Sequence, residues 1–352
     1  MKILHIVDAD FFERHRKTVS ETVLALSDAG LEQEIFTNEG ESLGWLSSIV
    51  PFSYFKMDKG GRTATLSNRL RVWKLVRRFS PDIVIKWGRG AREIAPQGRF
   101  VQVSFLGERE NLKRFDKTDY IMTNLDSMLL LAKENGFSGA KSFSLPGFVY
   151  RYKDMPPVTR KDFFIPEKAR IIYISGNFER GIGWEMLFDA MPSMFDTYFL
   201  IAGSGQHEEY VKDYASRVNI KARSRFVPEI ERTLLALEIS DMALLPFDSP
   251  GIAKDILEAQ MAKKPVVTIA TAVSREFIDD GENGFMVPKG DAYLLRQKIK
   301  DVLTMDASEK TKIVDRAYEQ VKVRTAEDAA SGYVRMFEEL VNKYRARRNL
   351  LH

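Results

Sequence analysis

The segment Arg170-Ile-Ile-Tyr-Ile-Ser-Gly-Asn-Phe-Glu-Arg-Gly181 reveals the architecture of the second half of the chain. Its first six residues form an apolar run that is typical of a buried strand, and glycines follow at once. A helical pattern over residues 183–191 comes next. A strand that passes through a glycine turn into a helix is the repeating unit of parallel sheets covered by helices.

The same unit recurs on both sides of this segment. Downstream, we predict strands at 198–202, 224–227, 242–246 and 265–269, and helices at 208–217, 231–240, 252–262 and over much of the chain from Gly290 onward. Upstream, we predict strands at 3–7, 34–37, 81–85, 100–105, 120–123 and 141–145, and helices at 18–29, 67–79 and 126–135. This alternation predicts an α/β fold with two doubly wound Rossmann-like domains that face a cleft.

A break in the pattern marks the expected domain boundary. Pro146-Gly147 and Met155-Pro-Pro157 interrupt the alternation, and charged residues are frequent from Arg151 to Lys168. A chain of 352 residues also exceeds what one hydrophobic core usually supports. We expect an N-terminal domain over 1–155 and a C-terminal domain over 156–334, with a last helix at about 335–352 packing back on the first domain.

Composition excludes several classes of function. The chain has no cysteine, and its four histidines are scattered, so disulfides, thiolate chemistry and a histidine-rich metal site are not expected. The net charge of +4 is mild, and the basic residues match no nucleic-acid-binding motif. The apolar run at residues 1–7 is too short for a signal peptide, and no run is long enough to span a membrane. We therefore expect a cytoplasmic protein.

Two glycine-containing loops are candidates for binding a phosphate. In the first, Ser175–Gly181, glycines permit close backbone approach, the helix that follows offers free amides, and Arg180 adds a positive charge. A plain strand-to-helix turn would explain that loop equally well. The second, Phe247–Glu258, leads through Gly251 into a helix on which the Glu258 carboxylate could accept hydrogen bonds from a sugar diol. The alternative is a solvated glutamate. A third glycine segment, 277–287, fits a structural turn better than a site.

Two features of the first half could also serve function. The segment 67–79 predicts a basic amphipathic helix that either lies on an anionic membrane surface or exposes a solvated face. Its cations are Arg69, Arg71, Lys74, Arg77 and Arg78. His15 belongs to the predicted loop Asp10–Lys17 after the first strand, where it could transfer a proton, bind an acceptor phosphate, or simply be a surface histidine.

Taken together, these segments resemble the family 4 type of retaining glycosyltransferases, which have the two-domain GT-B architecture. The likeness covers roughly residues 170–340. Arg225-Phe-Val-Pro228 is similar to the family's base-binding loop, 251–267 to its donor loop and glutamate helix, and Arg275–Phe285, the most specific match, to its post-donor segment.

The resemblance places the family's site residues one at a time. Its phosphate-binding lysine falls on Arg180, its phosphate-binding arginine on Asn177, and its ribose-binding glutamate on Glu258. The glutamate near the transferred sugar falls on Pro250, and the histidine that faces the sugar falls on Leu106, so this chain departs from the family there. Lys254 is our candidate for the phosphate charge missing at Asn177. The full candidate donor set is Gly176, Asn177, Arg180, Gly181, Val227, Ser249, Gly251, Ile252, Ala253, Lys254 and Glu258.

The resemblance implies a hexosyltransferase that uses an NDP-sugar, without a metal or a further cofactor. Asp8-Ala-Asp10 has the form of a metal motif but follows the first strand of the wrong domain. The expected acceptor is a glycan or a lipid-linked molecule of bacterial envelope polysaccharide synthesis, at the inner face of the membrane. The alternatives are a sugar-nucleotide epimerase and a non-catalytic GT-B protein that binds a sugar nucleotide or pairs with an active partner. A phosphorylase would need a pyridoxal lysine and a longer chain.

Overall fold

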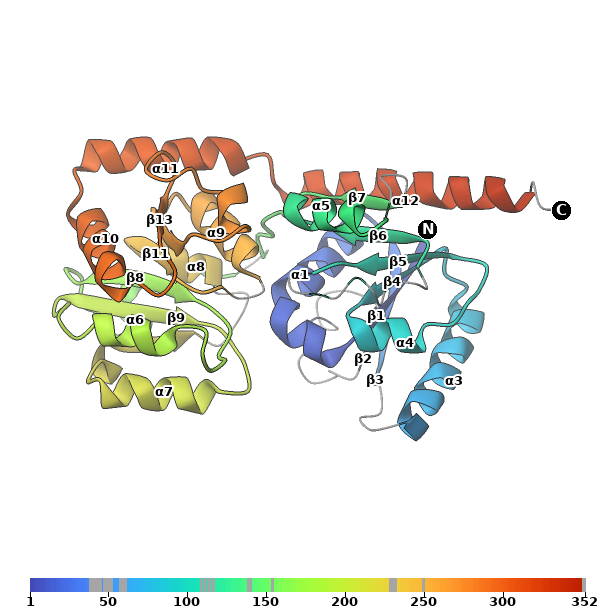
Figure 1. Cartoon of the computed structure of the whole chain (residues 1–352), viewed down its shortest axis with the longest axis horizontal. Helices are drawn as coiled ribbons and strands as arrows, with labels where there is room; N and C mark the ends of the chain where they lie inside the picture. The colour runs from blue at the N-terminus through green and yellow to red at the C-terminus, as the bar shows by residue number, and fades with distance from the viewer. Residues whose placement is uncertain are drawn as a thin grey trace. The chain divides into compact units, whose positions relative to one another are not determined.

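In the computed structural model the chain forms two compact units (Figure 1). Unit 1 comprises Met1–Gly147 and Thr325–His352, and unit 2 comprises Phe148–Arg324. The chain thus passes from unit 1 into unit 2 between residues 147 and 148 and returns to unit 1 between residues 324 and 325. The sequence predicted these boundaries at 155/156 and 334/335. The structure describes residues 1–37, 46, 53–56, 62–107, 110, 112, 115, 118–137, 141–152, 155–227, 233–248 and 251–349.

Unit 1 is built on a parallel sheet of seven strands in the order β3-β2-β1-β4-β5-β6-β7. The strands are β1 (Lys2–Val7), β2 (Glu32–Thr37), β3 (Ser53–Lys56), β4 (Ile83–Trp87), β5 (Val101–Phe105), β6 (Tyr120–Thr123) and β7 (Ser142–Ser144). The helices are α1 (Ala9–Asp28), α3 (Arg62–Phe79), α4 (Arg89–Ile94), α5 (Asp126–Glu134) and α12 (Ala326–Asn349).

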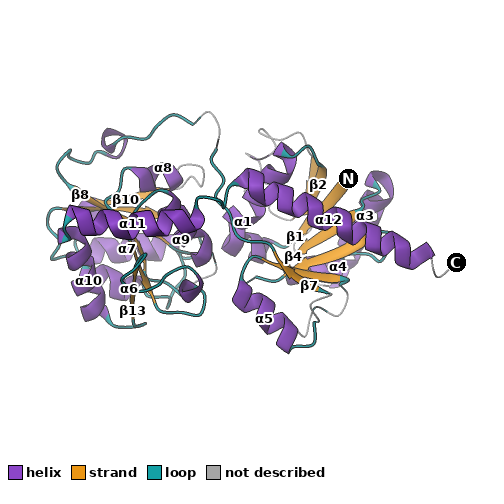
Figure 2. Ribbon diagram, turned by 90° about the horizontal axis from the view of Figure 1, so that it is seen from above, coloured by secondary structure: helices purple, strands orange, loops and turns teal. Residues whose placement is uncertain are grey.

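The strands of unit 1 alternate their side chains between two helical layers. Leu4 and Ile6 of β1 pack with Val72 and Phe79 of α3 and with Ile94 of α4. His5 points to the opposite face, where its hydrogen-bond partner Gln33 also donates to the Val23 carbonyl of α1. On that face α12 lies against α1 (Figure 2), and a buried hydrogen bond joins Tyr333 of α12 to Thr22 of α1. The sheet is therefore doubly covered, as the apolar strands predict.

Unit 2 repeats the plan with six parallel strands in the order β10-β9-β8-β11-β12-β13. The strands are β8 (Arg170–Ser175), β9 (Thr197–Ala202), β10 (Ser224–Val227), β11 (Met242–Leu245), β12 (Val266–Ile269) and β13 (Phe285–Val287). The helices are α6 (Trp184–Ala190), α7 (Glu208–Arg217), α8 (Thr233–Glu238), α9 (Ile252–Met261), α10 (Ala292–Thr304) and α11 (Ala307–Val321). The prediction of two doubly wound α/β sheets is thus confirmed.

One predicted element was wrong. Asp10–Lys17, predicted as a loop, belongs to α1, which starts at Ala9 directly after β1. The Asp8 carboxylate accepts a hydrogen bond from the Asp10 amide and caps the helix. Phe11, His15 and Val19 follow at four-residue spacing and are all buried, so this polar-looking segment has a buried face.

Candidate functional site

The sheet of unit 2 changes direction at one place, and the predicted donor loops meet there. β9 lies on one side of β8 and β11 on the other, so the loops after β8 and β11 leave neighbouring strands in opposite directions. In open α/β sheets this switch point is where ligands bind, beyond the carboxyl ends of the strands. Gly176–Gly183 follows β8, and the segment that ends at Gly251 follows β11.

Glycines let these loops pack without side chains between them. A Cβ on Gly176 would lie 2.4 Å from the Phe247 ring, and one on Gly203 would lie 2.1 Å from the Gly176 carbonyl oxygen. Two hydrogen bonds of 2.9 Å then fix the first loop. The Phe178 amide donates to the Ser204 carbonyl, and the Trp184 indole donates to the Asn177 carbonyl. Gly176 and Asn177 therefore lie on a fixed backbone path.

The helix α9 begins at this edge of the sheet. Its N-cap, Gly251, has a φ of 92° and supplies no side chain to cap the helix. The first-turn amides, including those of Ile252 and Ala253, face the end at which a helix attracts anions. Glu258 is only 3% exposed, so the interpretation as a solvated glutamate is wrong.

Lys254 lies on the first turn of α9 and is also buried, with 7% of its surface exposed. Its ammonium group donates a hydrogen bond to the carbonyl of Phe148, the first residue of unit 2. The same group lies 5.1 Å from the centroid of the Phe148 ring. An ammonium carries three N–H donors, so the bond to this carbonyl does not by itself prevent contact with an anion.

Arg180 is exposed at the end of the first loop. Its guanidinium lies 4.4 Å from the centroid of the Tyr210 ring, a cation–π contact that holds it against α7. The Tyr210 hydroxyl in turn donates to Glu185 over 2.6 Å, and this hydrogen bond raises the pKa of Tyr210. Arg180 is thus held beside the loop while its charge stays accessible to a ligand.

The remaining predicted donor residues are placed as follows. Val227 is buried at the carboxyl end of β10, and Gly181 has a φ of 73° in the first loop. Ser249 and Pro250 lie outside the described residues. Sequence reasoning missed Lys289, which pairs with Asp248 of the second loop over 2.8 Å. Residues 277–284 form a turn in which the Asn283 side chain accepts from the Asp279 amide and donates to the Phe277 carbonyl, and β13 follows this turn directly.

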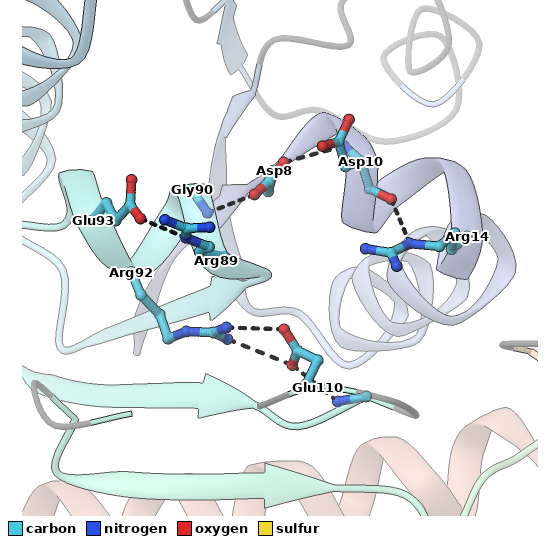
Figure 3. A network of polar contacts seen from close by, with 9 residues as sticks. Asp8, Asp10, Arg14, Arg89, Gly90, Arg92, Glu93 and Glu110 are labelled. Carbon is cyan, nitrogen blue, oxygen red and sulfur yellow. Dashed lines mark hydrogen bonds and ion pairs between the residues drawn. The ribbon is translucent and has the colours of Figure 1, made fainter. Parts of the chain in front are cut away.

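Unit 1 carries a second network at the carboxyl edge of its sheet (Figure 3). The two carboxylate oxygens of Asp8 accept from the amides of Asp10 at 3.1 Å and Gly90 at 2.5 Å. A Cβ at Gly90 would lie 2.7 Å from the Asp8 carboxylate, so a larger residue there would displace that side chain. Below it, Arg92 pairs with Glu110 over 2.9 Å, and both side chains are largely buried. The Asp8 carboxylate therefore holds the backbone at Asp10 and Gly90 in place.

His15 is not a surface histidine. It is 6% exposed on α1, and its ring stacks on Phe11 at a centroid distance of 4.3 Å. Burial, assisted by the charge of Arg14, lowers its pKa to about 3. The imidazole is therefore neutral at physiological pH. The backbone of His15 also departs from helical geometry, with a φ of −125°.

Leu106, which occupies the position of the family's sugar-facing histidine, is fully buried among Leu112, Phe115 and Ile121. Its side chain completes a core and presents no polar group. The resemblance and the structure therefore agree that this position cannot supply histidine chemistry. No group of three or more metal-ligating side chains occurs among the described residues. None of the described helices is long and apolar enough to cross a bilayer.

The five predicted cations of α3 (Arg69, Arg71, Lys74, Arg77 and Arg78) are exposed. Arg78 binds both carboxylate oxygens of Glu34, at 2.7 and 2.9 Å. The Arg77 guanidinium lies 4.5 Å from the centroid of the Trp73 ring. The face of α3 opposite the core holds Leu66, Leu70 and Trp73 as well as cations, so it is not an ordinary solvated face.

Part of the chain is similar to a known protein family. Residues 157–320 match the family Glycosyl transferases group 1. The chain is 26% identical over 307 residues to the lipopolysaccharide core biosynthesis glycosyltransferase LpsE of Rhizobium meliloti (strain 1021), covering 84% of this chain and 87% of that one.

Two solved structures share the fold over nearly the whole chain. Sucrose-phosphate synthase of Thermosynechococcus elongatus has a TM-score of 0.79 at 15% identity and covers 97% of this chain and 100% of its own. Anabaena HepE in complex with UDP and glucose has a TM-score of 0.76 at 14% identity and covers 96% and 99%. The predicted GT-B type of fold is confirmed.

Proposed function

We propose that this chain is an enzyme that moves a hexose from an NDP-sugar held by unit 2 to an acceptor, because residues 157–320 match the family Glycosyl transferases group 1. The observation that carries the proposal is the meeting of the 176–183 loop and the start of α9 at the switch point of unit 2. The relative from Rhizobium meliloti supports an acceptor in bacterial envelope polysaccharide synthesis, either a glycan or a lipid-linked molecule.

The proposed donor site divides its roles by chemistry. The amides of Gly251, Ile252 and Ala253 at the start of α9 would receive the diphosphate, and Arg180 would add a fixed charge. Glu258, buried two turns into α9, would accept hydrogen bonds from the ribose hydroxyls. Removing one comparable donor to a developing anion costs about 3 kcal/mol in other enzymes. Stabilisation of the leaving diphosphate therefore rests on this cluster, and we propose that it needs neither a metal nor a cofactor.

The resemblance to family 4 enzymes supports retention of the anomeric configuration. We propose that His15 does not exchange a proton with substrate, because a buried imidazole with a pKa of about 3 is a weak base at neutral pH. Its contribution is packing against Phe11 near the carboxyl edge of unit 1.

We also propose that the enzyme acts at the cytoplasmic face of the membrane and touches it through α3. The support is the cationic surface formed by Arg69, Arg71, Lys74 and Arg77, which suits an anionic bilayer. A single cationic helix gives reversible association, as expected of a peripheral protein.

A thermal-shift screen with UDP-, GDP- and ADP-sugars tests the donor site, because a tight ligand raises apparent stability by mass action. The expected result is one nucleotide class that raises Tm, and turnover of the same labelled donor. Arg180→Ala should remove most of the rise in Tm. The control is Arg217→Ala, which should leave the rise unchanged. Arg217 also makes a cation–π contact on α7, with its guanidinium 4.8 Å from the centroid of the Tyr214 ring. If no nucleotide shifts Tm, the donor site is wrongly assigned.

The alternative is a non-catalytic protein that binds a sugar nucleotide or partners an active enzyme. The observation that favours it is Leu106, whose buried side chain replaces the family's sugar-facing histidine. Saturable donor binding without transfer or hydrolysis, across a panel of acceptors, would select this alternative.

A further inference from the structure

The helix α3 exposes apolar side chains where a solvated helix would be polar. Its buried face holds Val72, Leu75 and Phe79, which pack in the core of unit 1. On the other side Leu66, Leu70 and Trp73 are 61%, 57% and 44% exposed. At 3.6 residues per turn these three fall within an arc of about 60°, so they form one continuous stripe. A contiguous exposed apolar patch usually marks an interaction surface.

A cavity of about 670 Å³ opens beside this stripe. One wall includes Leu66, Leu70 and Trp73 of α3. The other includes Ile94, the last residue of α4, and the two residues that follow it, Ala95 and Pro96. The Arg69 side chain fastens the two walls by donating to the Glu93 carbonyl over 3.1 Å. The lining is mostly hydrocarbon, and the volume lies within the range of about 300–1,000 Å³ that small-molecule sites show.

The charges around the cavity favour one class of occupant. The sequence of α3 contains no acidic residue, and Arg69, Lys74 and Arg77 flank the apolar stripe. Among the described residues Lys74 has no carboxylate partner, and Arg77 contacts the Trp73 ring rather than an acid. Protein interfaces deplete lysine at their centres, whereas a bilayer interface combines tryptophan, aliphatic side chains and cations in this way.

We propose that α3 lies on an anionic bilayer and that the cavity takes one acyl chain of an anionic phospholipid, whose phosphate binds Arg69 and Arg77. This rests on the membrane contact proposed above and adds a chain-binding site to it. Leu66, Leu70 and Trp73 would enter the acyl region, while the arginines remain at the level of the phosphates. The site is separate from the donor loops, which belong to unit 2.

Vesicle sedimentation tests the surface. The protein should bind vesicles of phosphatidylglycerol and phosphatidylcholine at least tenfold more tightly than vesicles of phosphatidylcholine alone, and more weakly at high salt. The double variant Leu66→Glu, Leu70→Glu should lose at least tenfold in affinity. The matched control Leu130→Glu on α5, where the leucine is 59% exposed, should bind like the unaltered protein. Equal losses in both variants, or no preference for anionic vesicles, overturn the proposal.

Two further measurements test the chain site itself. Lipids brominated along their acyl chains should quench the fluorescence of Trp73. This fluorescence is the difference between the protein and Trp73→Phe, because the other three tryptophans are the same in both. Ala95→Phe, which fills the cavity and keeps every charge, should reduce that quenching and lower vesicle affinity several-fold. Binding without quenching, or quenching unchanged by Ala95→Phe, shows that no chain enters the cavity.

Transfer to a water-soluble acceptor separates this proposal from the proposed function. The α3 variants should leave transfer to such an acceptor unchanged, because none of them alters a residue of the donor loops, which belong to unit 2. Absence of transfer in the unaltered protein would refute the enzymatic proposal while vesicle binding remained measurable. Capture of a protein through the same stripe, with no vesicle binding, would assign the surface to a different partner and overturn the lipid site.

Discussion

Among single residues, Lys254 is the one for which the structure adds most to what the sequence predicts. Sequence comparison suggests a phosphate-binding charge, and the structure adds that the ammonium group already binds the Phe148 carbonyl. Binding the Phe148 carbonyl and binding a phosphate are compatible roles, because the ammonium group of Lys254 lies at the start of α9 and carries three N–H donors.

Lys254→Ala should weaken binding of the preferred nucleoside diphosphate about tenfold, which corresponds to about 1.4 kcal/mol. Isothermal titration calorimetry measures the change. Lys263→Ala is the control, since Lys263 follows α9 and pairs with Asp315 at the surface over 2.8 Å. Unchanged affinity in Lys254→Ala would mean that the lysine only links α9 to Phe148, where the chain enters unit 2.

Two buried histidines make unit 1 sensitive to acid. Burial lowers the pKa of His5 to about 4, against a smaller opposing effect of the hydrogen bond to Gln33, and lowers that of His15 to about 3. The Trp87 indole donates to Nδ1 of His5 over 3.1 Å, so the neutral tautomer must carry its proton on Nε2. Both rings are therefore held neutral in the folded state.

Below pH 6.5 the unfolded chain binds more protons at these two rings than the folded chain, so unit 1 should lose stability as pH falls toward about 4 and 3. A difference of one pKa unit corresponds to about 1.4 kcal/mol. Urea unfolding between pH 4 and 7 should show a shallower decline in His15→Phe than in the unaltered protein. An identical pH dependence in the variant would contradict the buried, neutral state of His15.

Among the loops and helices of unit 2, the loops after β8 and β9 pack so closely that their contact leaves no room for a side chain at Gly203. Gly203 has a φ of 155°, and its Cβ would lie 2.1 Å from a backbone oxygen that cannot rotate away. Gly290 is the natural comparison, since its φ is 86° but nothing lies within 4 Å of its Cβ position.

Gly203→Ala should therefore destabilise unit 2 by clearly more than Gly290→Ala, for which backbone strain alone costs about 1–2 kcal/mol. Gly203→Ala should also reduce donor affinity, because the Gly176 carbonyl that must move belongs to the proposed phosphate loop. Urea unfolding and donor titration give the two readouts. Equal destabilisation by both substitutions would show that the loops relax freely.

The sequence predicted most elements because the strands of both sheets are covered on two faces and therefore appear as unbroken apolar runs. β8, β6 and α7 were predicted at the bounds that the structure shows. The start of α1 was missed, because Glu13, Arg14, Arg16 and Lys17 hide the buried spacing of Phe11 and His15. The candidate loops could be predicted from their glycines, but the burial of Lys254 and its bond to Phe148 depend on contacts between segments 106 residues apart.

At the scale of the whole molecule, unit 1 depends on its last helix. Phe337 of α12 is fully buried, and Tyr333 joins α12 to α1 through Thr22, with burial raising the pKa of Tyr333 to about 12. By contrast, Arg345 makes an exposed ion pair with Asp82 over 2.8 Å.

Phe337→Ala should destabilise unit 1 by about 3–5 kcal/mol, the usual cost of such a cavity. Hydrogen exchange followed by mass spectrometry should show faster exchange in α1 and α12 and unchanged exchange in the strands of unit 2. Arg345→Ala should shift exchange little, since an exposed ion pair contributes at most about 1 kcal/mol. Faster exchange throughout unit 2 would mean that the two units do not unfold independently.

The hydrogen bond of 3.0 Å from the Val149 amide to the Arg324 carbonyl has a consequence for synthesis on the ribosome. It places the entry and the exit of unit 2 side by side, so unit 2 is an insertion between Gly147 and Thr325 of unit 1. During translation the whole of unit 2 is made before α12, so unit 1 cannot complete its core until unit 2 has been synthesised. The half of the chain made first therefore waits for a helix encoded after unit 2, and chaperones would meet its uncovered α1 surface throughout that interval.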